Sequence, residues 1–448
     1  MEKQRYERPV IQKMNAGLMN KFGTKTENEV INNIDGVPVR SLTQQFGSPL
    51  FVLSERKIRR NMQNAKRIFK TRYPKVQFAW SYKTNYLDAV CRIFHQEGSW
   101  AEVVSGFEYD KALCNNVPGD KIIFNGPFKT DEDLLKAARN NSLIHIDHYD
   151  ELYDLIRISE ANNLKPRVAI RVNMDTGIYP KWDRFGFNFE NGQAWNALAR
   201  IINSGCLQLV GVHCHIGTFM LSPAAYAVAA KNLCELAWTV KERHGIVLEY
   251  IDLGGGFPST NTLKGAYLPG TDTVPSLDQF ADAITDVVIG YGFHHDELPT
   301  LILESGRALI DDAGYLITTV LATKRLSDGR RATILDAGVN TLFTSFWYEH
   351  KVNPAQQMGN MTEETVLFGP LCMNIDVIRE NVLLPLMEKG NQLVIEKVGA
   401  YNMTQWMQFI TTRPNVVLVD NDNNPHIIRK AEKLGYIVEP EQVPDHLA

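Results

Sequence analysis

Short apolar runs alternate with stretches of helical periodicity between residues 76 and 307 of the chain. Each run has the length and β-branched or aromatic content of a strand, and each is followed by a helical stretch. The runs are VQFAWSYK, SWAEVVS, KIIFNG, SLIHID, RVAIRVN, LVGVHCHIG, LEYIDLGGG and TLILESGR. Eight β/α repeats in succession are typical of a closed parallel barrel. The pattern therefore predicts a (β/α)8 barrel of the TIM type.

Polar and reactive residues stand at or near the ends of all eight runs. They are Lys83, Ser105, Asn125, Asp147, Arg171, His215, Gly254 to Gly256, and Glu304 with Arg307. The C-terminal ends of barrel strands form one face of the fold, so these side chains are expected to meet at one mouth. A lysine, a histidine, a glycine-rich turn, an acid and an arginine together indicate a site for a phosphorylated carbonyl cofactor.

The pattern of apolar and polar residues changes on both sides of the predicted barrel. Residues 1–49 contain strand-like pieces broken by Asp-Gly and Gly-Ser turns, and a helix is expected to begin at the N-cap Ser54. Residues 308–448 contain longer β runs without regular helices. We therefore predict an N-terminal segment that joins a β-rich C-terminal domain, with the barrel at residues 50–307 between them. The tail from about Pro414 is expected to form a strand at Val416–Val419 and a helix over residues 427–434.

The composition and charge of the chain limit the classes of partner and the cellular compartment that are expected. The net charge of the 448-residue chain is −4, and the charges are well mixed, so neither nucleic acid nor an anionic membrane is an expected partner. No apolar run approaches the roughly 20 residues that span a bilayer. The first residues, MEKQRYERPVIQKMNAG, lack the apolar core of a signal peptide. The six cysteines include no CxxC pair, which indicates a reducing cytoplasm.

Lys83 and the glycine triplet are the first two candidate features of the site. A lysine that ends an apolar strand is partly desolvated, which is expected to lower its pKa and make the amine nucleophilic. The alternative for Lys83 is an ordinary phosphate contact or ion pair. The glycines of DLGGGFP, at residues 252–258, allow backbone N–H groups to approach an anion closely, although such a triplet also forms simple turns.

Three further features involve charged and aromatic residues. In ESGR, Glu304 could bond a pyridinium nitrogen and Arg307 a phosphate, or the two could form an ion pair at the barrel rim. Arg171 could orient the ring or form an ordinary salt bridge. In HCHIGT, His215 could lie flat on a ring and Thr218 could donate to the phosphate.

The same HCHIGT motif also suggests a metal site. Its two histidines are two residues apart and would share one face of a strand. No carboxylate or cysteine set completes a ligand group in the nearby sequence, so no metal is expected. Taken together, the lysine, the phosphate cradle, the acid and the ring-stacking histidine match a pyridoxal 5′-phosphate site better than any alternative.

Several motifs also resemble those of a known family. SYKTN, EVVSGFE, FNGPFKTDEDL, HCHIGT, GGGFP, ESGR, GPLC and GAY occur in the order found in fold-type III pyridoxal phosphate decarboxylases. This group includes the diaminopimelate, ornithine and arginine decarboxylases, and the chain is most similar to the diaminopimelate branch. The resemblance covers nearly the whole chain. It implies an alanine racemase-like barrel with a C-terminal β domain, and an enzyme that releases CO2 and an amine.

The resemblance also implies roles for individual residues. Lys83 forms the Schiff base with the cofactor, His215 stacks on the ring, and Glu304 bonds the ring nitrogen. The implied phosphate ligands are Gly254, Gly255, Gly256, Thr218, Arg307 and Tyr401. Family members are homodimers in which the β domain of one subunit completes the site of the other. Cys372 of GPLC is then the implied proton donor.

The chain departs from the family where the substrate is bound. Diaminopimelate decarboxylases have an acid directly after the cysteine, which binds the distal amine; here Met373 follows, and Asp376 is the nearest acid. They also have an arginine four residues before a tyrosine, which binds the distal carboxylate; here Thr344 precedes Tyr348. We therefore hypothesise that meso-diaminopimelate is not the main substrate. The alternatives are an amino-acid racemase on the same fold and a non-catalytic regulatory homologue.

Overall fold

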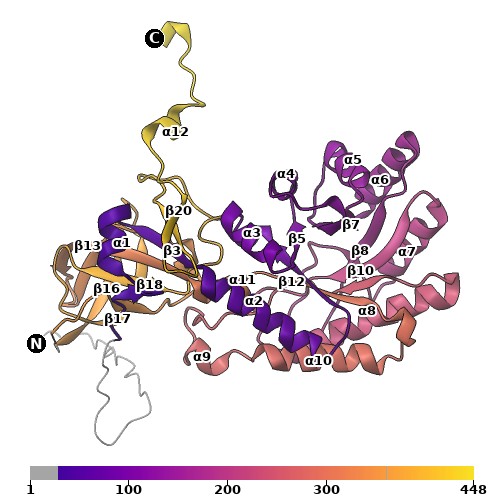
Figure 1. Ribbon diagram of the computed structural model, residues 1–448, viewed down its shortest axis with the longest axis horizontal. Helices are drawn as coiled ribbons and strands as arrows, with labels where there is room; N and C mark the ends of the chain where they lie inside the picture. Colours follow the sequence, from indigo (N-terminus) through magenta and orange to yellow (C-terminus); the bar gives the residue numbers. More distant parts are fainter. Residues whose placement is uncertain (1–28, 360, 448) are drawn as a thin grey trace, which may run out of the picture.

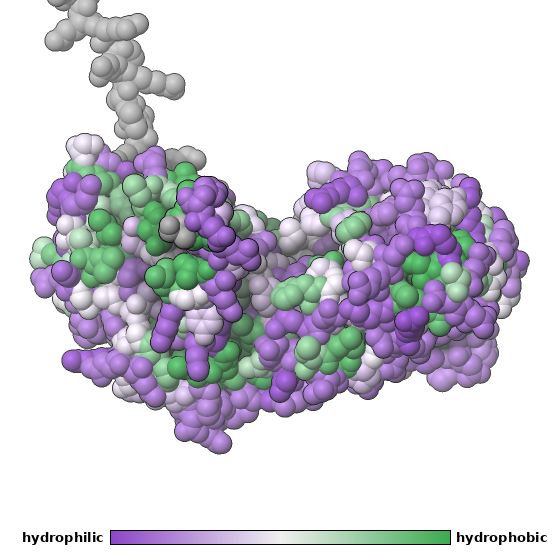
Figure 2. Space-filling model, turned by 90° about the horizontal axis from the view of Figure 1, so that it is seen from above, coloured by the Kyte–Doolittle hydropathy of each residue, from purple (hydrophilic) through white to green (hydrophobic). Residues whose placement is uncertain are grey.

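The computed structural model describes residues 29–359 and 361–447 and places them in two domains that lie side by side (Figure 1). One domain is a barrel covered by helices, and the other is rich in β-strands. Seen from above, the molecule is hollowed between these two parts (Figure 2). The first 28 residues of the predicted N-terminal segment lie outside the described residues. No helix in the part of the chain that the structure describes is long and apolar enough to cross a membrane.

Parallel strands close into the predicted barrel. In ring order they are β4 (Val76–Ser81), β5 (Trp100–Val103), β6 (Ile122–Phe124), β7 (Leu143–Ile146), β8 (Arg167–Asn173), β10 (Gln208–Cys214), β11 (Tyr250–Asp252) and β12 (Thr300–Ser305). The ring is closed because β12 pairs with β4 and β10 pairs with β8. The short strand β9 (Phe187–Asn188) adds to β8. The (β/α)8 prediction is confirmed.

Amphipathic helices follow the strands and cover the barrel. They are α3 (Asp88–Gln96), α4 (Gly106–Cys114), α5 (Asp131–Arg139), α6 (Tyr149–Asn162), α7 (Gln193–Ser204), α8 (Pro223–His244) and α10 (Leu277–Gly290), with α2 (Glu55–Lys70) preceding β4. Side-chain caps fix several of their starts. The Ser54 side chain accepts from the Lys57 N–H, as predicted, and Thr130 forms a capping box with Asp133.

The second domain is built on another sheet. Its main path runs β17 (Val377–Pro385), β16 (Thr362–Phe368), β14 (Arg331–Leu335), β13 (Gly314–Arg325), β3 (Leu50–Ser54), β19 (Val416–Val419) and β20 (Pro425–Arg429). Beside this path, β18 (Gln392–Glu396) pairs with β13 and with β15 (Val352–Pro354). Because β3 pairs with β13 and β19, residues 50–54 belong to this sheet and not to the barrel segment predicted to begin at residue 50.

The N-terminal segment packs on the β-rich sheet, as its predicted joining role requires. A hairpin of β1 (Asn33–Ile34) and β2 (Val37–Pro38) leads into α1 (Val39–Phe46). The apolar side chains of this helix share a buried cluster with strands β3, β13 and β19. Burial of that apolar surface holds the segment against the sheet.

The predicted tail is correct in its first half and wrong in its second. Val416–Val419 forms strand β19, but residues 425–429 form strand β20 in place of the expected helix. The cause is the turn between them. Asp420 accepts from the backbone N–H groups of Asp422 and Asn424, and Asn423 adopts φ 66°, so the chain reverses into a hairpin. A short helix, α12 (Leu434–Val438), follows.

Candidate active site

Lys83 lies in a short turn directly after β4, at the mouth of the barrel. Its ammonium group is 2.8 Å and 2.7 Å from the two carboxylate oxygens of Glu102, which is buried on β5. Burial lowers the pKa of Lys83, but the charges of Glu102 and Glu304 outweigh burial and raise it above its usual value. The predicted lowering of this pKa is therefore wrong for the protein without cofactor, because Glu102 pairs with the amine.

One pocket gathers most of the predicted site residues. It is lined by Ser81, Lys83, Thr84, His215, Thr218, Gly255, Gly256, Phe257, Glu304, Gly306, Arg307 and Tyr401. The barrel residues come from the ends of β4, β10, β11 and β12 and the loops that follow them, whereas Tyr401 comes from the β-rich domain. The barrel geometry thus brings together residues that are more than 200 positions apart in sequence.

The glycine triplet after β11 has no room for side chains. Gly254 and Gly256 adopt φ values of +64° and +91°, and a Cβ atom at Gly255 would lie 2.2 Å from the carbonyl oxygen of Glu304. The turn is fixed by Asp252, whose Oδ1 accepts from the Gly254 N–H at 2.8 Å. A turn without side chains, next to the C-terminal ends of strands, fits close approach of a phosphate.

Arg307 contacts three other polar side chains at the mouth of the barrel. The Arg307 guanidinium donates to the Thr218 hydroxyl at 3.4 Å and to the Tyr348 hydroxyl. It also lies 4.6 Å from the centre of the Tyr401 ring. Arginine, hydroxyl groups and a glycine turn are a donor set that suits a phosphate, so the residues present fit the phosphorylated cofactor that the sequence predicts.

His215 borders the pocket with a neutral ring. Burial and then the nearby charges of Arg171 and Lys83 hold the pKa of His215 well below its usual value. Its Nδ1 accepts from the Gly255 N–H at 3.0 Å, which fixes the ring beside the glycine turn. Trp182 packs beside the imidazole in a T-shaped arrangement, with ring centres 5.7 Å apart. A fixed, neutral imidazole is suited to lie against an aromatic cofactor ring.

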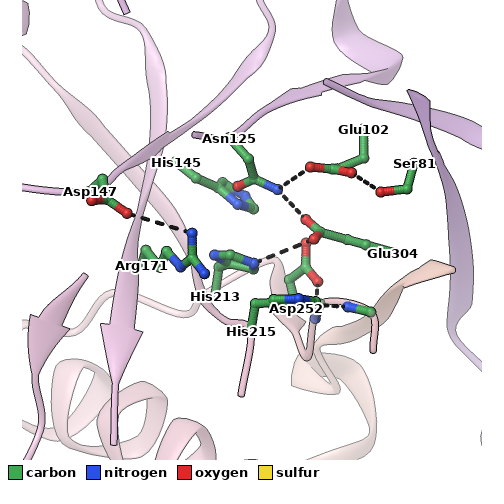
Figure 3. A network of polar contacts seen from close by, with 12 residues as sticks. Ser81, Glu102, Asn125, His145, Asp147, Arg171, His213, His215, Asp252 and Glu304 are labelled. Atoms are coloured by element: carbon green, nitrogen blue, oxygen red, sulfur yellow. Dashed lines mark hydrogen bonds and ion pairs between the residues drawn. The ribbon is translucent and has the colours of Figure 1, made fainter. Parts of the chain in front are cut away.

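A buried polar network lies beneath the pocket, inside the barrel (Figure 3). The Asn125 amide donates to Glu304 and, at 3.2 Å, to Glu102, so it joins the two acids. Arg171 is 3.7 Å from Asp147 and stacks on the Phe185 ring at 4.2 Å. Burial lowers the pKa of Arg171 from its high ordinary value. Arg171 is therefore a buried cation beside the network.

His213 and His215 point to different surroundings, so they do not form the pair that a shared strand face suggested. His213 lies in the barrel interior, where one atom each of His145, His213, Asp252 and Glu304 lie within 4.8 Å of one another. Two carboxyl groups thus stand beside His213, which the nearby sequence did not indicate. His145 is already engaged, since its Nε2 bonds the Tyr250 hydroxyl at 2.8 Å.

The β-rich domain of the same chain reaches the barrel mouth through the GAY segment. The Tyr401 N–H donates to the Thr84 carbonyl at 2.8 Å, and the Thr404 hydroxyl donates to the Lys83 carbonyl at 2.8 Å. Tyr348 is buried beside Arg307. Both predicted tyrosines are therefore anchored at the mouth, and the lysine turn is held from the second domain.

Other predicted site residues lie outside the pocket. Cys372 is exposed on the loop between β16 and β17. Met373, next to it, is partly buried. Asp376 is buried, and its two oxygens accept from the N–H groups of Val339 and Leu371, both at 2.7 Å. The proposed contact of Asp376 with a substrate is therefore not supported, because its carboxylate holds the loop.

Thr344 is also buried, and its hydroxyl is engaged away from the pocket. It lies 2.8 Å from the His350 Nε2 atom and donates to the side-chain Oδ1 atom of Asn402 at 3.0 Å. A substrate contact by Thr344 would break both hydrogen bonds. The expected contact at this position is therefore not supported either.

Residues that the motifs did not single out complete the network. Glu102 is the first residue of the EVVSGFE motif and was given no role there, yet it pairs with Lys83. Asp252 lies two residues before Gly254, the first glycine of the triplet, and was taken as part of that turn alone. Both residues end or nearly end a barrel strand, and this position was the available signal.

Comparison with known proteins identifies the family. The sequence model of the pyridoxal-dependent decarboxylase family, pyridoxal binding domain, matches residues 55–311. Diaminopimelate decarboxylase of Methanocaldococcus jannaschii is 32% identical over 435 residues, which cover 92% of this chain and 95% of that protein. The Bacillus subtilis diaminopimelate decarboxylase is 27% identical and covers 93% of this chain and 96% of its own length.

Solved structures agree with the sequence relatives. The crystal structure of the M. jannaschii diaminopimelate decarboxylase has a TM-score of 0.86 at 29% identity, covering 94% of this chain and 99% of that one. The lysine/ornithine decarboxylase of Vibrio vulnificus, crystallised with putrescine, has a TM-score of 0.72 at 23% identity and shares the fold.

The fold and the pocket define a pyridoxal phosphate enzyme of the alanine racemase-like barrel type. The chain belongs to the pyridoxal-dependent decarboxylase family, in its diaminopimelate decarboxylase-like branch. It is accordingly an amino-acid decarboxylase that uses pyridoxal phosphate.

Proposed function

We propose that the main substrate of this decarboxylase is an amino acid other than meso-diaminopimelate. The observation that carries the proposal is the lack of a charge pair at residues 344 and 373, where the family resemblance places an arginine and an acid. Here these positions hold a threonine and a methionine. Because meso-diaminopimelate has a second amino-carboxylate at its distal end, both of its distal charges would lose their partners.

The nearest polar groups are poor substitutes for these partners. Both oxygens of Asp376 accept from backbone N–H groups, and the Thr344 hydroxyl is bonded to His350 and Asn402. Met373 offers only an apolar side chain. An unpaired charge that loses water costs several kcal/mol. A substrate whose distal end is neutral, such as a side-chain-acylated diamino acid, avoids this cost.

The site residues have separate tasks in this proposal. Bound pyridoxal phosphate supplies an electron sink for the bond to the α-carboxylate. Lys83 would hold the cofactor through its amine, and the Glu304 carboxylate would accept from the ring nitrogen and so keep that nitrogen protonated. Neutral His215 would pack against the ring, and buried Arg171 would orient it. Gly254, Gly255, Gly256, Thr218, Arg307 and Tyr401 would hold the phosphate.

The proton that replaces CO2 requires a donor, and we assign it to Cys372 of the partner subunit in a homodimer. Cys372 is exposed, does not line its own chain's pocket, and lies on a loop that Asp376 holds through the Leu371 N–H. An ordered, exposed loop is able to present a thiol to a second subunit. Tyr348, anchored by Arg307, lies at the mouth where the substrate enters.

A second candidate substrate is meso-diaminopimelate itself. It is favoured by the relatives, since proteins named diaminopimelate decarboxylase match this chain over more than nine-tenths of its length. The two candidates make opposite predictions about the ranking of substrates. They agree on the reaction, so one assay separates them.

The experiment is a CO2-release assay on the enzyme loaded with pyridoxal phosphate. Its panel contains meso-diaminopimelate, both enantiomers of lysine, ornithine and arginine, and side-chain-acylated diamino acids. We expect kcat/KM for the best substrate to exceed that for meso-diaminopimelate by at least about 100-fold, because buried unpaired charges discriminate strongly. Diaminopimelate as the best substrate would refute the proposal. Loss of optical activity without CO2 would instead support the racemase alternative.

A matched variant tests the reason for the ranking. Met373→Asp restores an acid next to Cys372 and should raise kcat/KM for meso-diaminopimelate relative to the preferred substrate. Met373→Leu keeps an apolar side chain of similar size and should leave the ranking unchanged. An equal effect of both variants would show that charge at this position does not select the substrate.

A further inference from the structure

Two carboxyl groups lie side by side in the barrel interior (Figure 3), and one of them, that of Glu304, also lines the pocket. Asp252 ends β11, Glu304 lies near the end of the neighbouring strand β12, and an oxygen of each lies within 4.8 Å of the other. Their residues are 0% and 4% exposed. Two ionised carboxylates at this distance, without water, repel each other strongly. A proton shared by the pair removes this repulsion.

The hydrogen-bond partners indicate which carboxyl group holds the proton. Glu304 accepts from the Asn125 amide, and Asp252 Oδ1 accepts from the Gly254 N–H. The second oxygen of Asp252 is buried and has no donor among residues 29–359 and 361–447. An unprotonated oxygen would remain unsatisfied there, whereas a protonated one could donate to Glu304.

We propose that Asp252 is protonated at neutral pH and donates a hydrogen bond from Oδ2 to Glu304, acting as a positioning residue for that acid. Burial, and then the charge of Glu304, raise the pKa of Asp252 well above its ordinary value, which agrees with the geometry. Asp252 does not itself line the pocket, so it acts through Glu304 and Gly254.

The charged groups around Asp252 and Glu304 favour one negative charge on this pair over two. The cations facing the network are Lys83, which is paired with Glu102, Arg171, which faces Asp147, and Lys129, which is paired with Glu151. The imidazoles of His145 and His213 are neutral, because burial holds the pKa of each well below its usual value. Because each of these cations already has an acidic partner, a proton on Asp252 leaves the Asp252–Glu304 pair with one negative charge instead of two.

This arrangement connects the two ends of the cofactor site. One oxygen of Asp252 fixes the Gly254 turn that borders the phosphate end, and its proton orients Glu304 at the ring end. Glu304 is thereby held in a fixed position in the pocket lining. The inference rests on the family assignment and is independent of which amino acid the enzyme decarboxylates.

The test compares Asp252→Asn with Asp252→Ala. Asparagine reproduces a protonated aspartate, since its oxygen can accept from Gly254 while its amide donates to Glu304. We expect Asp252→Asn to bind pyridoxal phosphate within about threefold of the unmodified protein, and Asp252→Ala to bind it at least about tenfold more weakly. Visible absorption during cofactor titration measures both affinities.

A matched control uses Asp311, another buried acid. Its carboxylate accepts from Ser259, Asn261 and the Ala400 N–H, so it is surrounded by donors. Asp311→Asn would place an amide N–H2 against these donors and should lower the melting temperature of the protein without cofactor. Asp252→Asn should leave that melting temperature nearly unchanged, because it preserves every hydrogen bond of the proposed state.

Infrared spectroscopy gives a direct readout on the protein without cofactor. A carbonyl stretch of a buried protonated carboxyl group should be present at pH 7.5 and absent in Asp252→Asn. The proposal is overturned if no such band is lost, or if Asp252→Asn binds the cofactor as weakly as a folded Asp252→Ala. It is also overturned if the purified protein holds one metal ion per chain that Asp252→Asn removes, because a metal would require both carboxylates ionised. If Asp252→Ala does not fold, the asparagine variant and the infrared band still test whether Asp252 is protonated.

Discussion

The ammonium group of Lys83 is held by both carboxylate oxygens of Glu102, at 2.8 Å and 2.7 Å. Glu102 is fully buried, and Ser81 and Asn125 also donate to it. The lysine therefore has a fixed position before any cofactor binds. Such preorganisation reduces the entropic cost of bringing the amine to the cofactor aldehyde. The same ion pair keeps the amine protonated, so covalent bonding requires transfer of a proton away from Lys83.

Replacement of this lysine should abolish turnover while leaving the barrel folded. We expect Lys83→Ala to lose the visible band of covalently bound cofactor and at least about 10³-fold in kcat, since no other amine lines the described pocket. Lys75→Ala is the control, because Lys75 lies just before the opposite end of β4 and is exposed. Visible spectra, circular dichroism and CO2 release measure the three properties. Retained activity in Lys83→Ala would refute its assigned role.

The glycine turn should tolerate no side chain at its centre. In Gly255→Ala the new Cβ would lie 2.2 Å from the Glu304 carbonyl oxygen, so the backbone of one of the two strands must move. We expect cofactor affinity to fall by at least about tenfold. Gly290→Ala is the matched control, because an added Cβ meets no atom within 4 Å at that helical position. Cofactor titration of both variants would contradict the prediction if their affinities were equal.

His350 should make the protein sensitive to acid. Burial lowers the pKa of His350 to about 3, and its ring is bonded to Thr344 and to the Glu396 carbonyl. A histidine with a depressed folded-state pKa contributes stability above its unfolded pKa of about 6.5, and this contribution is lost as pH falls from there toward 3. We expect about 2 kcal/mol of stability to be lost between pH 7.5 and pH 5 through this residue.

The measurement is urea unfolding at several pH values, because other groups also titrate in this range. His350→Gln has no charge to gain, so the difference in unfolding free energy between it and the unmodified protein should shrink as pH falls. His426→Gln serves as the control, since His426 is exposed in the β19–β20 hairpin. A constant difference for His350→Gln across the range would contradict the prediction.

The barrel could be predicted from sequence because each strand and helix has its own periodic pattern. The site at its mouth followed, because barrel topology brings strand ends together whatever lies between them. Pairings between side chains could not be predicted in this way. Whether Lys83 would be free or paired depended on Glu102, which lies on the next strand of the barrel. The helix expected at residues 427–434 does not form, because the turn at Asp420 reverses the chain into a hairpin despite the apolar spacing of these residues.

The hydrogen bonds of the residues expected to contact the substrate could not be predicted from the sequence either. Motif alignment identified Thr344 and Asp376 by position only, and position does not reveal hydrogen bonding. In the folded chain Thr344 bonds His350 and Asn402, and Asp376 bonds two backbone N–H groups. These partners lie up to 58 residues away in sequence. Long-range hydrogen bonds of this kind leave no local pattern in the sequence, so only the structure reveals the partners of these side chains.

Cys372 gives the clearest test of a site shared between subunits. Cys372→Ala should bind the cofactor normally and lose at least about 100-fold in kcat, because the proton donor to the product is missing. Cys114→Ala is the control, since Cys114 is also exposed but lies on the far end of helix α4. Unchanged activity in Cys372→Ala would remove its assigned role.

Mixed dimers then separate a shared site from a self-contained one. Lys83→Ala and Cys372→Ala are each inactive in this prediction, but a heterodimer of the two has one site in which an intact Lys83 meets Cys372 of the partner subunit. Random exchange of equal amounts yields half heterodimers, each with one working site, so about one quarter of the unmodified activity should return. Activity that stays at the level of the parent variants, in heterodimers verified by mass spectrometry, would show that each chain uses its own residues.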